Sequence, residues 1–166
     1  MRFEFSAGGV VLRQAQDFGS KPQSSKKNWE VLVSQHSQHH GWVFPKGLIG
    51  DHVKGEKKSA SAKGFGETKE EAAVREVEEE TGVSAKILKP LSPVTYWYLL
   101  EEEKIKKTVY YFLMEFISED PNKRDMEMEN VEWLPIDKVE ERLTYKSDKD
   151  VWKEVKQILE SSPDLQ

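Results

Sequence analysis

The chain has 166 residues, enough for one domain with a substantial core, and its 37% hydrophobic and 33% charged residues suit a soluble globular protein. A net charge of −5 argues against nucleic acid as a bulk partner, because such binding requires a basic face, although a local basic pocket can still bind a small anion. Cysteine is absent, which excludes disulfides and thiol catalysis.

The N-terminus has no apolar run followed by a cleavage site, so we expect no signal peptide. The longest apolar stretches, around 94–100 and 109–114, are too short to span a bilayer. We therefore expect a cytoplasmic protein without a membrane partner. Nothing in the sequence indicates the oligomeric state.

Residues with high β propensity predict a series of strands separated by polar segments. The polar segment 14–28 is expected to be a loop, and 42–47 a strand end or turn. Lys, Ser, Gly and Ala dominate the following segment, so a flexible insertion is expected at about 50–63. The predicted strands are 3–13, 30–35, 85–91, 94–101, 107–116 and 131–134.

A helix is predicted over about 68–81. Thr68 and Glu71 have capping-box spacing, and Gly82 is a plausible residue to end the helix. Two further helices are expected at 136–143 and 148–160. This order of strands and helices predicts an α/β fold, with a mixed β-sheet between helices. We expect one domain over 1–160, followed by a C-terminal tail at 161–166.

The predicted helix 68–81 carries three glutamates at helical spacing. Glu76 and Glu80 are four residues apart, and Glu79 is three residues from Glu76, so their carboxylates share one patch. Two interpretations remain open for this patch. It is either a solvated acidic face or a site for a hard divalent cation such as Mg²⁺, with Mn²⁺ as a substitute. Arg75 is placed to pair with one of the carboxylates.

One segment of the chain matches the pattern E-x7-R-E-U-x-E-E-x-G-U, in which U is aliphatic. The segment consists of Glu67, seven further residues and then 75–83 (REVEEETGV). In this the chain resembles the Nudix hydrolases. The resemblance implies the Nudix fold, an α/β/α sandwich, and hydrolysis of a nucleoside diphosphate linked to another group. It also implies site residues: Glu76, Glu79 and Glu80 as metal ligands, Glu76 as candidate base, Arg75 as the residue that orients the glutamates, and Glu67 as support.

One position departs from the family pattern. The glycine that the family places shortly before the glutamate matching Glu67 is replaced by Ser61. Gly47 is the better counterpart, with the insertion between them, and the resemblance implies that a carbonyl near Gly47 joins the metal shell. The insertion is either a disordered segment or a lid that carries lysines towards phosphates.

Softer motifs at 5–10, 42–47, 107–112, 131–135 and 143–146 resemble the bacterial asymmetrical diadenosine tetraphosphate hydrolases. This resemblance implies phosphate contacts by Lys46, Lys107 and His40. Tyr111 and Tyr145 are either adenine-stacking aromatics or ordinary core residues. Glu127 is either a further metal carboxylate or a surface acid.

Three histidines lie close together in the sequence, at 36, 39 and 40. We expect them to form a polar loop at the mouth of the groove rather than a transition-metal site, because no cysteine or carboxylate partner set frames them.

The function expected from the resemblance is Mg²⁺-dependent cleavage of a nucleoside polyphosphate, with diadenosine tetraphosphate giving ATP and AMP. Other diphosphate substrates remain alternatives: an RNA 5′ end, a nucleoside triphosphate, ADP-ribose or an inositol pyrophosphate. A non-catalytic Nudix domain that binds a nucleotide is a further alternative, although a complete set of box glutamates argues against it.

Overall fold

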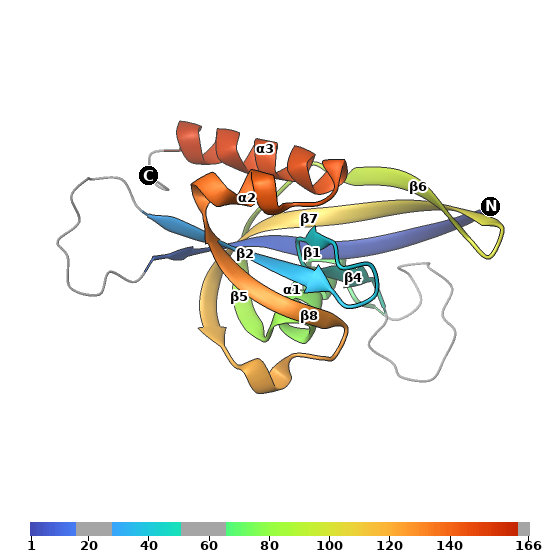
Figure 1. Ribbon diagram of the computed structural model, residues 1–166, viewed down its shortest axis with the longest axis horizontal. Coiled ribbons are helices and arrows are strands. Elements are labelled where there is room, and N and C mark those ends of the chain that lie inside the picture. The colour runs from blue at the N-terminus through green and yellow to red at the C-terminus, as the bar shows by residue number, and fades with distance from the viewer. Residues whose placement is uncertain (16–27, 51–65, 163–166) are drawn as a thin grey trace.

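The computed structural model describes residues 1–15, 28–50 and 66–162 (Figure 1). The expected loop at 14–28, the insertion at about 50–63 and the tail at 161–166 lie wholly or largely outside these described residues.

The described strands form one mixed sheet with the order β3-β2-β1-β7-β5, in which β4 also pairs with β1, β6 with β7 and β8 with β2. β1 and β7 are parallel, and the other neighbouring pairs are antiparallel. The strands are β1 (Arg2–Gln14), β2 (Trp29–His36), β3 (Trp42–Val43), β4 (Lys46–Leu48), β5 (Val83–Pro90), β6 (Val94–Leu100), β7 (Glu103–Glu119) and β8 (Met128–Pro135).

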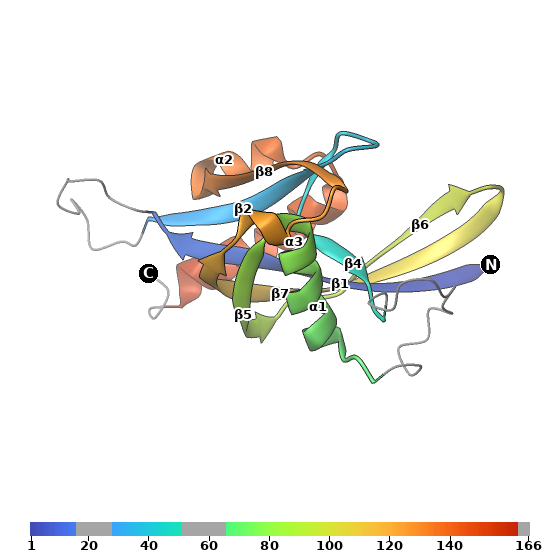
Figure 2. The ribbon, with the colours of Figure 1, turned by 90° about the horizontal axis from the view of Figure 1, so that it is seen from below.

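Helices cover both faces of this sheet (Figures 1 and 2). α1 (Lys69–Thr81) packs on one face, and α2 (Ile136–Arg142) and α3 (Lys146–Ser161) pack on the other. The structure is therefore an α/β/α sandwich with a mixed sheet, which confirms the predicted fold class.

The central strand β1 buries both of its faces. Val10 and Leu12 pack in the same hydrophobic cluster as Trp152 of α3, whereas Val11, between them, packs in the cluster of Val77 on α1. Successive side chains of a strand point to opposite faces, so a strand between two helical layers needs apolar residues at consecutive positions. This is why 10–12 is an unbroken apolar run.

Helix α1 begins and ends where its sequence predicts. The Thr68 side chain accepts a hydrogen bond from the Glu71 backbone N–H, which satisfies one of the free donors of the first turn. Gly82 ends the helix with a left-handed backbone (φ 78°), and its N–H donates to the Glu78 carbonyl at 2.8 Å. Glycine adopts this conformation without the steric cost that a side chain brings.

Strand β7 is longer than the predicted 107–116. It extends to Glu103 because β6 and β7 form a hairpin, and Glu101 and Glu102 at its turn both have positive φ (48° and 67°). The sequence lacks the Asn-Gly or Asp-Gly pair that usually marks such a turn, which explains why the prediction stopped short. The hairpin and the start of β1 extend beyond the helices (Figures 1 and 2).

Two smaller differences concern the C-terminal half. A short 3-10 helix, η1 (Pro121–Lys123), was not predicted, and α3 begins two residues earlier than expected. Among the described residues, no helix combines the length and the apolar character needed to cross a bilayer.

Candidate active site

Arg75 lies at the centre of a cluster of carboxylates. Its Nε donates to Glu67 Oε2 at 2.8 Å, and its Nη1 donates to both Glu76 Oε1 (2.7 Å) and Glu79 Oε2 (3.0 Å). Its Nη2 also donates to the Leu48 carbonyl at 3.0 Å, which ties α1 to β4. Burial by itself lowers the pKa of Arg75, but its contacts with Glu67 and Glu76 outweigh burial and raise it above the ordinary value. This geometry suits the predicted role of orienting the glutamates.

A pocket of about 630 Å³ opens beside this cluster. Glu76 and Glu80 of α1 line it, whereas Glu79 is half-exposed and held by Arg75. The pocket also brings together residues from six strands and from the loops between elements. Its lining comprises His36, Gln38, His39, Val43, Lys46, Gly47, Leu48, Glu76, Glu80, Tyr96, Tyr98, Lys107, Glu127, Met128 and Tyr145.

Glu80 is the most deeply placed carboxylate of the pocket, with 4% of its surface exposed. Burial raises its pKa well above the ordinary value; the charge of Lys46 opposes this rise, and the charges of Glu76 and Glu127 add to it. The Lys46 backbone N–H donates to Glu80 Oε2 at 3.1 Å. Burial therefore disfavours the charged form of Glu80, and a divalent cation bound beside it would stabilise that form.

Oxygen donors of this kind fit Mg²⁺ or Mn²⁺ chemically. In the part of the chain that the structure describes, no three acidic or histidine side chains are grouped closely enough to hold an ion directly. Arg75 instead bridges Glu76 and Glu79. Metal binding by these carboxylates stays a prediction, and it requires their side chains to turn towards a common point.

Gly47 on β4 allows α1 to approach the strand. A Cβ atom at this position would overlap the carboxylate of Glu76. Only glycine leaves room for this carboxylate between β4 and α1. The structure thus places Gly47 next to the box glutamates, although 27 residues lie between Gly47 and Arg75 in the sequence.

The basic residues of the pocket are partly those predicted. Lys46 and Lys107 both line it, and burial, together with the charge of Lys46, lowers the pKa of Lys107. His40 does not line it, and its phosphate contact stays a prediction. His40 has a left-handed backbone (φ 57°) and an exposed ring whose Nδ1 lies 2.8 Å from a Glu129 carboxylate oxygen. His39 lies in the pocket instead, and its ring stacks on His36 at 4.3 Å.

The two tyrosines take different places. Tyr111 is 3% exposed within the core and its hydroxyl donates to Asp148, so the core alternative applies and stacking on a base is corrected. Tyr145 is 40% exposed, lines the pocket, and its hydroxyl lies 2.9 Å from His39 Nδ1. Glu127 also lines the pocket, as the metal-carboxylate alternative requires.

A second pocket, of about 490 Å³, adjoins the first and shares His39, Lys46, Tyr96 and Tyr145 with it. Asp148 at the start of α3 lies at its base. This carboxylate is 2% exposed and accepts from the Phe44 N–H (3.3 Å), and burial raises its pKa.

Sequence reasoning missed Tyr96, Tyr98 and Asp148 as pocket residues, whereas it placed His39 in the polar loop expected at the mouth of the groove. The sequence did contain a signal for Tyr96 and Tyr98, because they are two residues apart on a strand and therefore lie on the same face. Lys107 lies on this face as well, since it is paired with Tyr96. Asp148 had no comparable local signal.

A mixed sheet between helices, with a box of glutamates beside a pocket that holds lysines, is the architecture that the Nudix-box resemblance implies. The chain belongs to the NUDIX domain family, whose model matches residues 22–155.

The curated proteins to which the chain is similar include two from mycobacteria. The chain is 35% identical over 104 residues to MutT4 of Mycobacterium tuberculosis, which is named as a mutator protein, and this match covers 63% of the chain and 36% of that protein. It is 30% identical over 146 residues to the 8-oxo-(d)GTP phosphatase of Mycolicibacterium smegmatis, covering 88% of the chain and 39% of that protein. The chain thus spans well under half the length of either relative.

Solved structures share the fold at low sequence identity. A binary complex of the C. elegans Ap4A hydrolase has a TM-score of 0.65 at 22% identity, covering 96% of this chain and 99% of that chain. The NUDIX domain of Shewanella oneidensis NrtR, crystallised with ADP ribose, has a TM-score of 0.64 at 17% identity, covering 96% of this chain and 90% of that chain. Both likenesses support the Nudix fold.

The raised pKa of Glu80 leads to a prediction about stability. The folded protein holds the Glu80 proton more tightly than the unfolded chain does, so protonation of Glu80 stabilises the fold. This stabilisation is fully present below the ordinary glutamate pKa of 4.5, and it is lost as the pH rises through the higher pKa of the folded state. We expect Glu80→Gln to raise the Tm of the metal-free protein at pH 8, and to remove the increase in Tm that Mg²⁺ gives the wild type. Calorimetry at pH 5 and pH 8, with and without Mg²⁺, measures both effects.

Glu78→Gln is the matched control, because Glu78 lies on the same helix but pairs with Lys123 at 3.9 Å outside the pocket. The control should keep the wild-type response to Mg²⁺. A Glu80 variant that still gains Tm with Mg²⁺ as the wild type does would remove Glu80 from the set of metal ligands.

Proposed function

We propose that this chain is a Mg²⁺-dependent Nudix pyrophosphohydrolase of a nucleoside polyphosphate, with diadenosine tetraphosphate as the substrate that its features support best. One observation carries the proposal: a single pocket is lined both by two box glutamates and by Lys46 and Lys107. Carboxylates that attract a divalent cation, together with lysines that attract phosphate oxygens, form a site suited to a polyphosphate.

In this proposal Glu76, Glu79 and Glu80 hold Mg²⁺, with Glu127 and the carbonyl of Gly47 as further ligands. When bound, the cation would neutralise phosphate charge and would make a water molecule more acidic. Glu76 is the candidate base that takes the proton of the attacking water, and Arg75 holds this carboxylate in position through its 2.7 Å hydrogen bond.

Lys46 and Lys107 bind phosphate oxygens and orient the chain of phosphates. Attack by water forms one P–O bond and breaks the anhydride P–O bond, and the departing phosphate oxygen carries the charge. With diadenosine tetraphosphate, attack at an outer phosphorus gives AMP and ATP. Lys107 suits this role because it is partly buried, so water screens its charge less than it screens that of a fully exposed lysine.

The second pocket supports a nucleoside as part of the substrate. Tyr145 and Tyr96 offer aromatic surface for a base, and Asp148 offers a buried carboxyl group for hydrogen bonding. The asymmetrical diadenosine tetraphosphate hydrolase motifs favour the dinucleotide. The name of the M. smegmatis relative, 8-oxo-(d)GTP phosphatase, makes an oxidised guanine nucleoside triphosphate the second candidate.

A panel of substrates with Mg²⁺, read by chromatography of the products, tests this proposal. We expect the highest kcat/KM for diadenosine tetraphosphate, with AMP and ATP in equal amounts. The panel also contains 8-oxo-dGTP, ADP-ribose, a 5′-triphosphate RNA and an inositol pyrophosphate.

Tyr145→Ala serves as a control for the nucleoside part: it should raise KM for the nucleotides and leave the inositol substrate unaffected. A higher kcat/KM for another compound would identify that compound, rather than diadenosine tetraphosphate, as the preferred substrate. No turnover with intact nucleotide binding would support a non-catalytic domain.

A further inference from the structure

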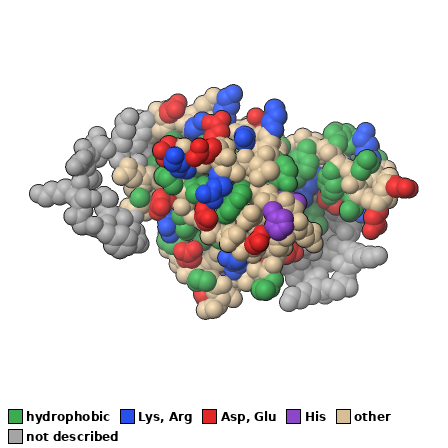
Figure 3. Space-filling view, in the orientation of Figure 1, with side chains coloured by type: hydrophobic (Ala, Val, Ile, Leu, Met, Phe, Trp, Pro, Cys, Tyr) green, Lys and Arg blue, Asp and Glu red, His purple; other side chains and the backbone are tan. Residues whose placement is uncertain are grey.

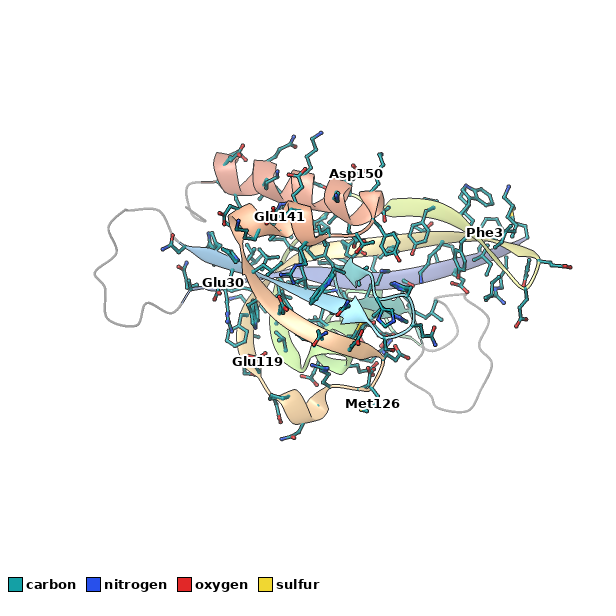
Figure 4. The ribbon with its side chains drawn as sticks, in the orientation of Figure 1. Phe3, Glu30, Glu119, Met126, Glu141 and Asp150 are labelled. Carbon is teal, nitrogen blue, oxygen red and sulfur yellow. The ribbon has the colours of Figure 1, made fainter. Side chains whose placement is uncertain are left out.

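Strand β6 forms an open edge of the sheet. Within the described residues it pairs only with β7, and its outer side has no backbone partner. It also carries large apolar side chains that are exposed: Trp97 at 48%, Leu99 at 73% and Leu100 at 49%. Hydrophobic side chains gather at this end of the molecule, at the right of Figure 3, and Phe3 of β1 lies nearby (Figure 4).

The other long edge strands carry the residues that normally prevent edge pairing. β5 contains Lys86, Lys89 and Pro90, and β8 contains Glu129, Glu132 and Pro135. β6, with the sequence VTYWYLL, contains neither a charge nor a proline. Lysine, other charges and proline discourage another strand from adding to an edge, whereas an uncharged, apolar edge favours it.

We propose that β6 pairs with β6 of a second copy of this chain, antiparallel and about a twofold axis at Trp97. In this register Trp97 lies opposite itself, Tyr96 opposite the second copy's Tyr98, Thr95 opposite Leu99, and Val94 opposite Leu100. All seven residues of the strand are used, and no charge faces another.

Two kinds of charge lie close to this pairing: Lys104 and Lys106 on the neighbouring strand, and Glu101, which directly follows Leu100 and lies opposite the second copy's uncharged Pro93 in this register. The ammonium groups of Lys104 and Lys106 lie 4.6 and 5.4 Å from the centre of the Trp97 ring. In the paired sheet the Lys106 residues of the two copies are three strand spacings apart, about 14 Å. This exceeds the Debye length of about 8 Å at physiological salt, so their repulsion is screened.

A second copy is favoured over a foreign strand because self-pairing closes the assembly. An isologous contact uses each β6 edge once, so growth stops at the dimer and neither edge remains exposed. The pairing of a strand with itself also needs no partner whose charges match, which suits an edge that has none.

The pairing has a consequence for the pocket. Tyr96 and Tyr98 point to the face of the sheet that lines the 630 Å³ pocket. Directly opposite residues of an antiparallel pair have Cβ atoms about 5 Å apart and lie on the same face. The second copy therefore places its Tyr98 beside Tyr96, at the pocket wall. The dimer itself does not depend on the proposed activity.

Sedimentation of the full chain tests the assembly. We expect a species of twice the 19.2 kDa monomer mass, and Trp97→Lys should weaken its Kd by about tenfold or more, because two lysines then face each other. Leu88→Lys is the matched control: Leu88 is exposed on β5, and this variant should remain a dimer. A wild-type monomer at all concentrations, or a dimer unaffected by Trp97→Lys, would overturn the proposal.

Crosslinking tests the register, because the chain has no cysteine of its own. Under mild oxidation Trp97→Cys should form a disulfide-linked dimer, since the two thiols lie opposite each other. Thr95→Cys should not, because its two copies are offset by four residues, about 13 Å along the strand. Equal crosslinking of both variants, or none for Trp97→Cys, would contradict the register.

Discussion

Replacing Glu79 by glutamine is expected to lower kcat by about 10²–10⁴-fold while the fold is retained. The substitution removes one carboxylate from the proposed Mg²⁺ ligands. It also removes the negative charge that Arg75 Nη1 contacts at 3.0 Å, which leaves Glu76 less firmly held. Steady-state kinetics on the best substrate of the panel measures the effect, and circular dichroism confirms the fold.

Glu78→Gln provides the control for this prediction. Glu78 is the preceding residue and has a similarly exposed side chain (38% against 44%), but it pairs with Lys123 rather than with Arg75. Its activity should stay within about twofold of the wild type, because an exposed ion pair contributes little. Full activity in Glu79→Gln, or an equal loss in both variants, would show that the metal-ligand assignment is wrong.

Gly47→Ala is expected to reduce kcat/KM by at least about 10²-fold, because small displacements of a catalytic group have effects of this size. The added methyl group would occupy the space of the Glu76 carboxylate, so either this side chain turns away or β4 and α1 separate. Crowding of this kind typically destabilises a protein by about 1–3 kcal/mol. Kinetics and thermal unfolding of the same preparation separate the two effects.

Leu48→Ala tests whether any change in β4 has this consequence. Leu48 is the next residue of the strand, its side chain is partly exposed, and its interaction with Arg75 uses the backbone carbonyl. We expect little change in activity for this variant. If Gly47→Ala retained wild-type kinetics and Mg²⁺ affinity, the position that Glu76 occupies in the structure would not be required for activity.

Local sequence was sufficient for helix α1 and for the neighbourhood of its glutamates. A cap at Thr68, a terminator at Gly82 and glutamates three and four residues apart involve contacts within one or two helical turns. The backbone geometry of a helix determines these distances, so the rest of the fold has little influence on them. The content of β-branched and aromatic residues likewise predicted the central strands.

The contacts of the site with other elements could not be predicted in the same way. His39 rather than His40 lines the pocket because the backbone at His40 is left-handed and turns its ring towards Glu129. Tyr111 belongs to the core because its strand face is covered by the cluster that includes α3, whereas Tyr145 precedes α3 at the surface.

The sequence by itself determined helix α1, since short-range periodicity and capping specify it. It also contains the Nudix box, and the resemblance to the Nudix hydrolases through this box implied the layered α/β/α class. Tertiary structure alone decided that Gly47 admits the Glu76 carboxylate, that Tyr96, Tyr98 and Asp148 join the pocket walls, and that β6 is left as an open edge. These features depend on how strands distant in sequence pair and on what the helices cover, and the free energy of that packing is shared among many residues rather than encoded in one segment.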